Sequence, residues 1–174
     1  MALRQILTEP NPILRKKSLV VEKVDDDLRK LMDDMLETMY AAPAIGLAAI
    51  QVGIPKKVIV LDIDQKEGHK KPLFFVNPEI IQKSKILSTY EEGCLSVPGQ
   101  FAEIDRPDKC HIKYLDYYGE KKEINAEGML ATCIQHEIDH LEGILFIDHL
   151  SKLKKTMIIK KLSKQKKTIE RIVV

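Results

Sequence analysis

The sequence predicts an α+β fold, and two observations lead to that class. Apolar residues recur at helical spacing along two segments, residues 28–39 and 130–141. Short runs rich in β-branched and aromatic residues, separated by polar turns, lie between these segments. With 174 residues, 44% of them apolar and 31% charged, the chain suits a single globular domain with a sizeable core.

The expected elements follow in order along the chain. Asp25 or Asp26 caps a first helix, which ends before Pro43. Its apolar face consists of Leu28, Leu31, Met32, Met35 and Met39. Strands are expected at residues 58–61, 73–76 and 80–90, with a polar loop over residues 64–71. Residues 110–117 and 121–124 should form a hairpin around a turn centred on Gly119.

The second helical segment contains the pentad His136-Glu137-Ile138-Asp139-His140. Two imidazoles one helical turn apart can each offer a ring nitrogen to the same cation. Glu137 projects beside them and can accept a proton from water without being a ligand. Random order would give about 0.01 such pentads in a chain of this composition. The pattern therefore favours a metal site over the alternative, a surface helix carrying ordinary polar residues.

The residues around the pentad indicate that this helix is buried. Apolar positions recur as one stripe, made of Leu130, Ile134, Ile138 and Leu141. The side that carries the two histidines also holds Met129, Thr132 and Cys133. Gly143 stands where the helix should end. Buried imidazoles need partners, and a metal ion is one way to satisfy both rings.

A catalytic site of this type needs three protein ligands and an open position. Cys94 is the best candidate for the third ligand, because the Gly and Pro around it mark a bend between strand-like stretches. Cys110 instead opens an alternating run, and Cys133 lies one turn before His136. Cysteine is among the most often buried residues, so plain core packing remains the alternative for Cys94.

Residues 150–174 differ in composition from the rest of the chain. Eight lysines and no acidic residue occur between residues 152 and 167. An apolar stripe accompanies them, formed by Leu150, Leu153, Met157, Ile158 and Leu162. This pattern predicts a basic amphipathic helix, with fraying expected after Lys167. The helix either docks on the core with a solvated lysine face or binds a polyanion in a salt-sensitive way.

The number of cysteines and the hydropathy of the sequence indicate in which cellular compartment the protein is expected. Three cysteines, an odd number without close spacing, favour a reducing compartment over a disulfide scaffold. The longest weakly polar run, residues 41–50, is too short to span a bilayer and is interrupted by Pro43 and Gly46. We therefore expect no membrane segment and a cytoplasmic protein.

Four blocks of this sequence resemble peptide deformylases. They are residues 6–15, the run Ile-Gly-Leu-Ala-Ala-Ile-Gln at residues 45–51, Glu-Gly-Cys-Leu-Ser around Cys94, and residues 135–141. The resemblance extends to about residue 155 and implies antiparallel or mixed sheets around a central metal-ligand helix. It also places the family's opening block within six residues of Met1, which leaves no room for a signal peptide.

The resemblance implies a metal-dependent hydrolase that removes the N-formyl group from the initiator methionine of nascent polypeptides and releases formate. Cys94, His136 and His140 would hold one divalent cation. By resemblance this cation is Fe²⁺ in the cell, with Zn²⁺, Ni²⁺ or Co²⁺ as substitutes. Metal-bound water would attack the formyl carbon, with Glu137 as general base and then as general acid.

The same resemblance implies further roles around this centre. Gln51 and the backbone N–H of Leu95 would stabilise the oxyanion. Gly46 would let the substrate backbone pass close to a strand edge. The methionine pocket would be lined by Ile45, Tyr90, Met129, Thr132 and Cys133. Plain core packing remains an alternative for Met129 and Cys133, and a surface turn for Gln51.

Some residues depart from the family pattern, and other functions stay open. Ala44 and Ile50 stand where relatives usually carry other residues, so the loop is expected to differ in shape there. Phe101 stands where some relatives carry an Arg that reaches the substrate, so any contact there would be apolar. Glu92 and Arg106 match positions that would pair to brace the cysteine segment, unless both are solvated. The alternative functions are a zinc peptidase or amidase and an inactive, ribosome- or RNA-associated binding module. In some relatives a tail of this kind docks to the ribosome.

Overall fold

The computed structural model describes residues 2–65 and 68–172. Within these residues it contains three α-helices and seven strands, which confirms the α+β class. Residues 66 and 67 of the predicted loop and residues 173 and 174 of the predicted tail lie outside the described part of the chain.

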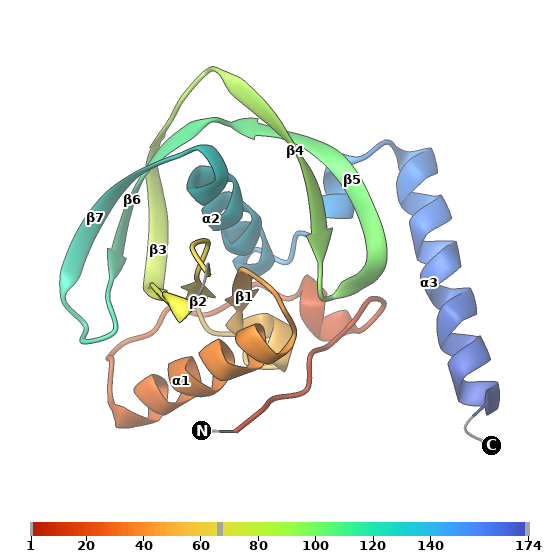
Figure 1. The fold of residues 1–174 in the computed structure, drawn as a ribbon, viewed down its shortest axis with the longest axis horizontal. Helices are drawn as coiled ribbons and strands as arrows, with labels where there is room; N and C mark the ends of the chain where they lie inside the picture. The colour runs from red at the N-terminus through yellow and green to blue at the C-terminus, as the bar shows by residue number, and fades with distance from the viewer. Residues whose placement is uncertain (1, 66–67, 173–174) are drawn as a thin grey trace.

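Two antiparallel sheets enclose one helix (Figure 1). The larger sheet has five strands in the order β1-β2-β3-β6-β7, and β4 pairs with β5 in a second sheet. The strands are β1 (Gly46–Ala48), β2 (Val58–Leu61), β3 (Leu73–Lys83), β4 (Leu87–Cys94), β5 (Val97–Pro107), β6 (Lys109–Leu115) and β7 (Lys121–Glu127). Helix α2 (Gly128–Leu141) contacts β1, β2, β6 and β7 of the larger sheet and β5 of the smaller one.

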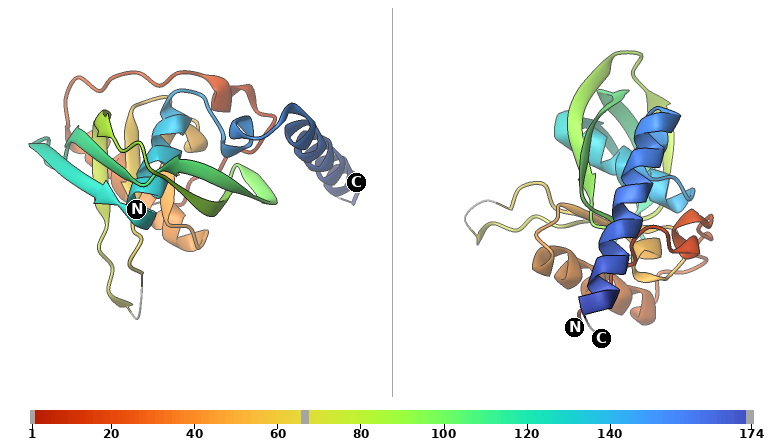
Figure 2. Two further views of the ribbon diagram at one scale, coloured as in Figure 1. Left: turned by 90° about the horizontal axis from the view of Figure 1, so that it is seen from above. Right: turned by 90° about the vertical axis from the view of Figure 1, so that its right-hand side faces the viewer.

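The other helices lie outside this arrangement. Helix α1 (Asp26–Ala41) packs on β1 and β2 through the predicted leucine and methionine face. Asp25 caps α1, since its side chain accepts a hydrogen bond from the Leu28 N–H. The chain also contains the short 3-10 helices η1 (Pro12–Arg15), η2 (Ala49–Val52) and η4 (Phe146–His149). Helix α3 (Lys152–Ile172) follows η4 and lies beside β5 (Figures 1 and 2).

The strand predicted over residues 80–90 is wrong as a single element. Strand β3 continues to Lys83, and a new strand, β4, begins at Leu87. Between them the chain changes partners, because Lys83 pairs with Cys110 of β6 whereas Leu87 pairs with Pro107 of β5. The chain thus passes from one sheet to the other. The alternation of polar and apolar residues does not depend on which strand is the neighbour, so the sequence pattern could not show this change of sheet.

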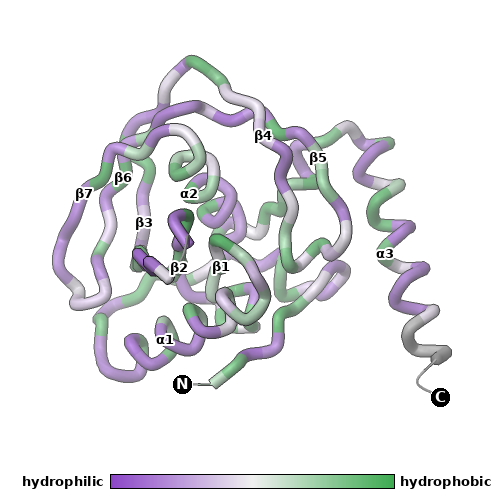
Figure 3. Tube along the Cα trace, viewed as in Figure 1, coloured by the Kyte–Doolittle hydropathy of each residue, from purple (hydrophilic) through white to green (hydrophobic). Residues whose placement is uncertain are grey.

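The apolar stripe predicted for the tail is only partly right. Leu153 and Met157 are 71% and 51% exposed, whereas Ile158, Ile159 and Leu162 pack against β5 and η4. The docked face is therefore rotated toward Lys155, whose ammonium forms an ion pair with Asp148. Figure 3 shows that hydrophilic positions are frequent along α3. No helix in residues 2–65 and 68–172 is long and apolar enough to cross a membrane.

Gly143 fixes how the chain leaves α2, and its replacement tests this exit. Its φ is +75°, and a Cβ there would lie 2.4 Å from the Arg15 carbonyl oxygen. Gly99 has a similar φ of +73° but open space around a Cβ. Left-handed backbone costs a non-glycine residue about 1–2 kcal/mol. We expect Gly143→Ala to lower the free energy of unfolding by more than Gly99→Ala, measured by urea denaturation. Equal losses of unfolding free energy in the two variants would show that the Arg15 carbonyl moves away from the new Cβ without destabilising the protein.

Candidate metal centre and active site

Cys94, His136 and His140 come together at one end of α2. Their ligand atoms all lie within 4.8 Å of one another, and Cys94 Sγ is 3.2 Å from His140 Nε2. The two imidazole rings have centroids 5.1 Å apart. Among the described residues this is the one group of three or more potential ligand residues that is compact enough to share an ion. The three predicted ligands are therefore adjacent in space.

The hairpin of β4 and β5 brings the cysteine to the helix. The ladder between these strands shifts register at Cys94, which pairs with Val97 across the turn. Val97 is fully buried in a cluster with Phe146 and Leu145 of the segment that follows α2. Because the hairpin turn is anchored by this apolar contact, the thiol at the end of β4 faces the two histidines.

A buried ion-pair network orients the first histidine. Glu92 Oε2 accepts a hydrogen bond from His136 Nδ1 at 2.9 Å, which leaves Nε2 of that ring free to act as a ligand. Arg106 donates to both oxygens of Glu92 at 2.6 and 3.1 Å and to Asp139 at 2.8 Å. Both Glu92 and Arg106 are buried, so the bracing role predicted for this pair is supported and the solvated alternative is wrong.

The two histidines differ in their proton affinity. Burial alone would lower the pKa of His136, but interaction with Cys94 and the hydrogen bond to Glu92 raise it well above the usual range. Burial lowers the pKa of His140 well below its usual range, and the neighbouring positive charges of His136 and Arg106 act in the same direction. A cation needs both rings neutral, so it competes with a proton mainly at His136.

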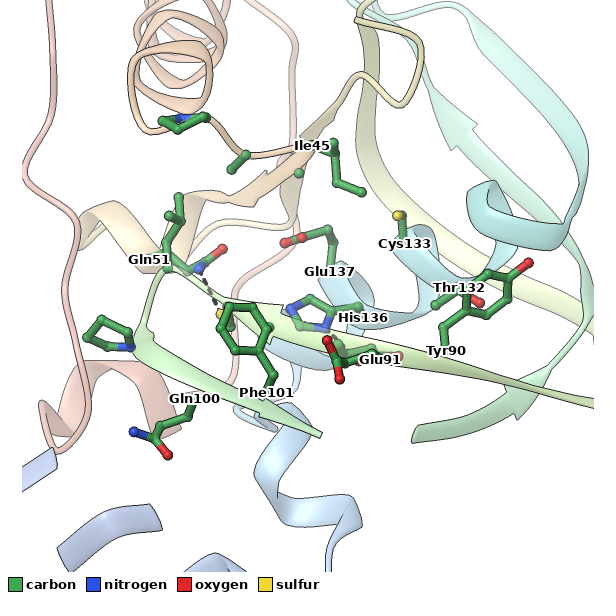
Figure 4. Close-up of a pocket in the computed structure, with 18 of the residues that line it drawn as sticks. Ile45, Gln51, Tyr90, Glu91, Gln100, Phe101, Thr132, Cys133, His136 and Glu137 are labelled. Carbon is green, nitrogen blue, oxygen red and sulfur yellow. Dashed lines mark hydrogen bonds and ion pairs between the residues drawn. The ribbon is translucent and has the colours of Figure 1, made fainter. Parts of the chain in front are cut away.

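Glu137 points from α2 toward β1, between Ile45 and His136 (Figure 4). It is buried, and its Oε2 has no hydrogen-bond partner in the described part of the chain. Burial raises the pKa of Glu137 to about 7, against the opposing charge of His136. A Cβ on Gly46 would lie 2.5 Å from Glu137 Oε1. In this structure the missing side chain of Gly46 therefore makes room for the carboxylate.

Gln51 is buried in η2, so the surface-turn alternative is wrong. Its Oε1 accepts a hydrogen bond from the Ala48 N–H at 2.9 Å, which fixes the orientation of the amide. Nε2 therefore faces the site, where it lies 3.1 Å from Ser96 Oγ and 3.4 Å from Cys94 Sγ. Leu95, in the turn after β4, lines the same space.

The metal cluster borders a pocket of about 480 Å³ between β1, the β4–β5 hairpin and α2. All six residues predicted to contact substrate line it: Ile45, Gly46, Tyr90, Met129, Thr132 and Cys133. Met129 is 43% exposed at the rim, so plain core packing is wrong for this side chain. His140 lies deeper, below the lining residues.

Several lining or supporting residues were missed from the sequence. Glu91, Gln100 and Phe101 border the pocket from the β4–β5 hairpin, and the exposed Phe101 ring packs against Gly93 (Figure 4). For residue 101 the sequence had predicted only that any substrate contact would be apolar. Ser96 and Asp139 touch Gln51 and Arg106 respectively. Both lie inside conspicuous motifs, but only the folded chain shows which partners they meet.

The donor set fits a divalent transition metal. One thiolate and two imidazoles suit iron, cobalt, nickel or zinc, and calcium and magnesium prefer oxygen ligands. Three protein ligands leave a coordination position open, as catalytic sites require. Among the residues that the structure describes, nothing donates a hydrogen bond to the buried Oε2 of Glu137, so a water molecule or a substrate in the pocket could supply it.

Comparisons with known proteins agree on one family. A family model described as Polypeptide deformylase matches residues 3–156. The peptide deformylase of Pelagibacter ubique is 66% identical over 166 residues, covering 95% of this chain and 96% of the relative. That of Phenylobacterium zucineum is 59% identical over 167 residues, covering 96% and 99%. The crystal structure of a peptide deformylase from Ehrlichia chaffeensis matches with a TM-score of 0.92 at 42% identity, covering 96% and 98%.

The raised pKa of Glu137 predicts a pH-dependent cost to folding in chelator-treated protein. Glu137 holds its proton more tightly in the folded state than in the unfolded chain, so its contribution to stability falls as pH rises from about 4.5 to about 7. A shift of this size corresponds to about 3 kcal/mol. As the pH rises through that interval, the free energy of unfolding of Glu137→Gln should increase relative to that of the wild type by about this amount. Urea unfolding at a series of pH values measures the difference.

Glu103→Gln is the matched control, because Glu103 is exposed on β5. It should leave the pH dependence of unfolding unchanged. Parallel curves for the wild type and Glu137→Gln would mean that Glu137 is ionised as easily in the folded protein as in the unfolded chain.

Proposed function

This chain belongs to the polypeptide deformylase family, and from that premise we propose which of its residues carry out the reaction. The enzyme hydrolyses the N-formyl group of peptides and releases formate. We infer that Cys94, His136 and His140 hold the catalytic cation. The observation that supports this assignment is their mutual approach within 4.8 Å, with Glu137 beside them in the pocket.

A bound divalent cation acts as a Lewis acid that lowers the pKa of water and polarises a carbonyl group. We propose Fe²⁺ as the ion used in the cell, with Zn²⁺, Ni²⁺ or Co²⁺ as substitutes. The family resemblance alone supports the choice of Fe²⁺, because the set of one sulfur and two nitrogen ligands accepts each of these metals.

Glu137 carries the proton through both halves of the reaction. Its carboxylate accepts a proton from the water whose oxygen attacks the formyl carbon. The resulting tetrahedral intermediate collapses when its C–N bond breaks, and Glu137 returns the proton to the departing amine. Formate and a peptide with a free amino terminus result. One carboxylate can thus act as the base in the first step and as the acid in the second.

Gln51 and the backbone N–H of Leu95 stabilise the negative charge that develops on the formyl oxygen. The Gln51 amide is held by Ala48 and Ser96, so its N–H groups are oriented before substrate arrives. Donors that need no reorganisation contribute most to such stabilisation. The methionine side chain occupies the largely apolar space formed by Ile45, Tyr90 and Cys133 with their neighbours Met129 and Thr132. Gly46 offers backbone groups at the edge of the larger sheet.

We further propose that the whole chain, residues 1–174, acts as one catalytic domain in the cytoplasm, where nascent formylated chains are made. Three free cysteines in the described structure fit a reducing compartment. Residues 150–174 form a basic tail, and the lysines of α3 would bind ribosomal RNA through its phosphates. The relatives named above are deformylases and lend no support to a peptidase or to an inactive binding module.

The role of Glu137 is tested by Glu137→Gln. We expect kcat for formate release from formyl-Met-Ala-Ser to fall by about 10²–10⁴-fold, because the proton acceptor is lost. Metal content should stay at one ion per chain, since the three ligands remain. Acetyl-Met-Ala-Ser serves as the blocked-peptide comparison.

The matched variant is Glu91→Gln, which removes a carboxylate from the rim of the same pocket. It should keep kcat within a few-fold of the wild type. Substantial turnover by a metal-loaded Glu137→Gln protein would exclude Glu137 as the base, and metal loss in that variant would make it a ligand instead.

The tail is tested by truncation after Leu150. We expect ribosome association to weaken, while turnover of a short formyl peptide changes less. Wild-type association should also weaken between 50 and 200 mM salt, as expected for lysine contacts to phosphate. Cosedimentation with ribosomes measures both effects. Association that is independent of salt would remove the electrostatic basis of this proposal.

A further inference from the structure

A chain of polar contacts runs from the surface to the metal-ligand helix. At its outer end, His149 Nε2 lies 2.7 Å from Asp139 Oδ2. The same Asp139 oxygen accepts a hydrogen bond from Arg106 Nη1 at 2.8 Å. Arg106 in turn holds Glu92, which accepts the His136 Nδ1–H. This chain of contacts joins the β4–β5 hairpin to α2 and to η4, which follows α2.

In this network Asp139 has a second hydrogen-bond donor, His149, besides Arg106. Glu92 and Asp139 bring two carboxylates to the single guanidinium of Arg106. Arg106 is buried, whereas the side chains of Asp139 and His149 are 21% and 38% exposed. An ionised carboxylate only accepts hydrogen bonds, so Nε2 of His149 carries the proton in this contact. The imidazole thereby holds the Asp139 oxygen at the position from which it meets Arg106.

The segment that carries His149 also contacts His136, the predicted metal ligand, directly. In η4, the ring of Phe146 stacks on His136 with centroids 6.3 Å apart and an interplanar angle of 22°. Phe146 is buried, and Asp148 of the same turn pairs with Arg15 and Lys155. One 3-10 turn therefore reaches His136 by two routes, through an aromatic face and through the polar chain.

We propose that Asp139 and His149 form a positioning pair for the metal centre, which holds Arg106 and Glu92 in the geometry that orients His136. This inference rests on the proposed function, because it takes His136 as a metal ligand. Neither residue is among those that line the pocket. Their effect is on how tightly the site holds its ion, and through that on kcat more than on KM.

Metal affinity measured by chelator competition with Co²⁺ tests the pair. Residues that hydrogen-bond to metal ligands typically contribute about 10- to 100-fold to metal affinity. Asp139 and His149 act through intervening residues, so we expect losses of about 10-fold for Asp139→Asn and about threefold for His149→Phe. His149→Gln keeps a donor and should recover most of the affinity. The double variant should bind no more weakly than Asp139→Asn alone, because the two residues act in series.

His111→Phe is the matched control. His111 forms an equivalent contact of 2.7 Å with Glu123, but on β6 and β7, outside the network. It should leave Co²⁺ affinity unchanged. Equal affinities for His149→Phe and His111→Phe would overturn the proposal, as would additive losses in the double variant. If His149→Phe does not fold, His149→Asn takes its place, since the shorter amide does not span the distance to Asp139.

The same titration separates this proposal from the assignment of the ligands. Cys94→Ser and His136→Ala should lose affinity by far more than any variant of the pair. If those two variants bind Co²⁺ as tightly as the wild type, the ligand set is wrong. If they fail to bind while the pair has no effect, only the positioning role is wrong.

Discussion

Arg106 is buried and cannot release its proton inside the protein, so the fold has to bring carboxylates to it. Glu92 and Asp139 meet this requirement from a strand and a helix that belong to different parts of the fold. The same contacts fix Glu92 beside His136, whose ring is thereby turned toward the pocket. The orientation of the metal site is thus a by-product of satisfying one buried positive charge.

Two rigid pieces meet at the site, and each supplies what the other lacks. Helix α2 provides both histidines and Glu137 on one face, because residues one turn apart project together. The thiol comes from the β4–β5 hairpin. Gln51, reached through η2, bridges them, since its amide is fixed by Ala48 on one side and meets Ser96 and Cys94 on the other. The polar floor of the pocket is therefore assembled before any substrate enters.

The sequence was sufficient for features that depend on neighbours along the chain, such as α1, α2 and the paired histidines. It could not reveal contacts across the fold. Cys94 meets His140 from 46 residues away; the bend around Cys94 made it a candidate ligand, and family resemblance favoured this role over core packing. Gly46 was predicted to lie beside the substrate, but the sequence did not show that its missing Cβ also makes room for Glu137. The face of α3 was misplaced because it is set by contacts across the fold, namely apolar packing against β5 and η4 and the ion pair between Lys155 and Asp148.

The pocket has an apolar rim above a polar floor, and this division has a thermodynamic consequence. Ile45, Phe101 and Met129 are all more than 40% exposed around the opening. When a peptide covers them, apolar surface leaves water and the heat capacity falls. Burial of polar groups changes the heat capacity in the opposite sense. If burial of the rim outweighs burial of the floor, the binding enthalpy of a peptide becomes more favourable on warming, and its slope with temperature measures the difference between the two.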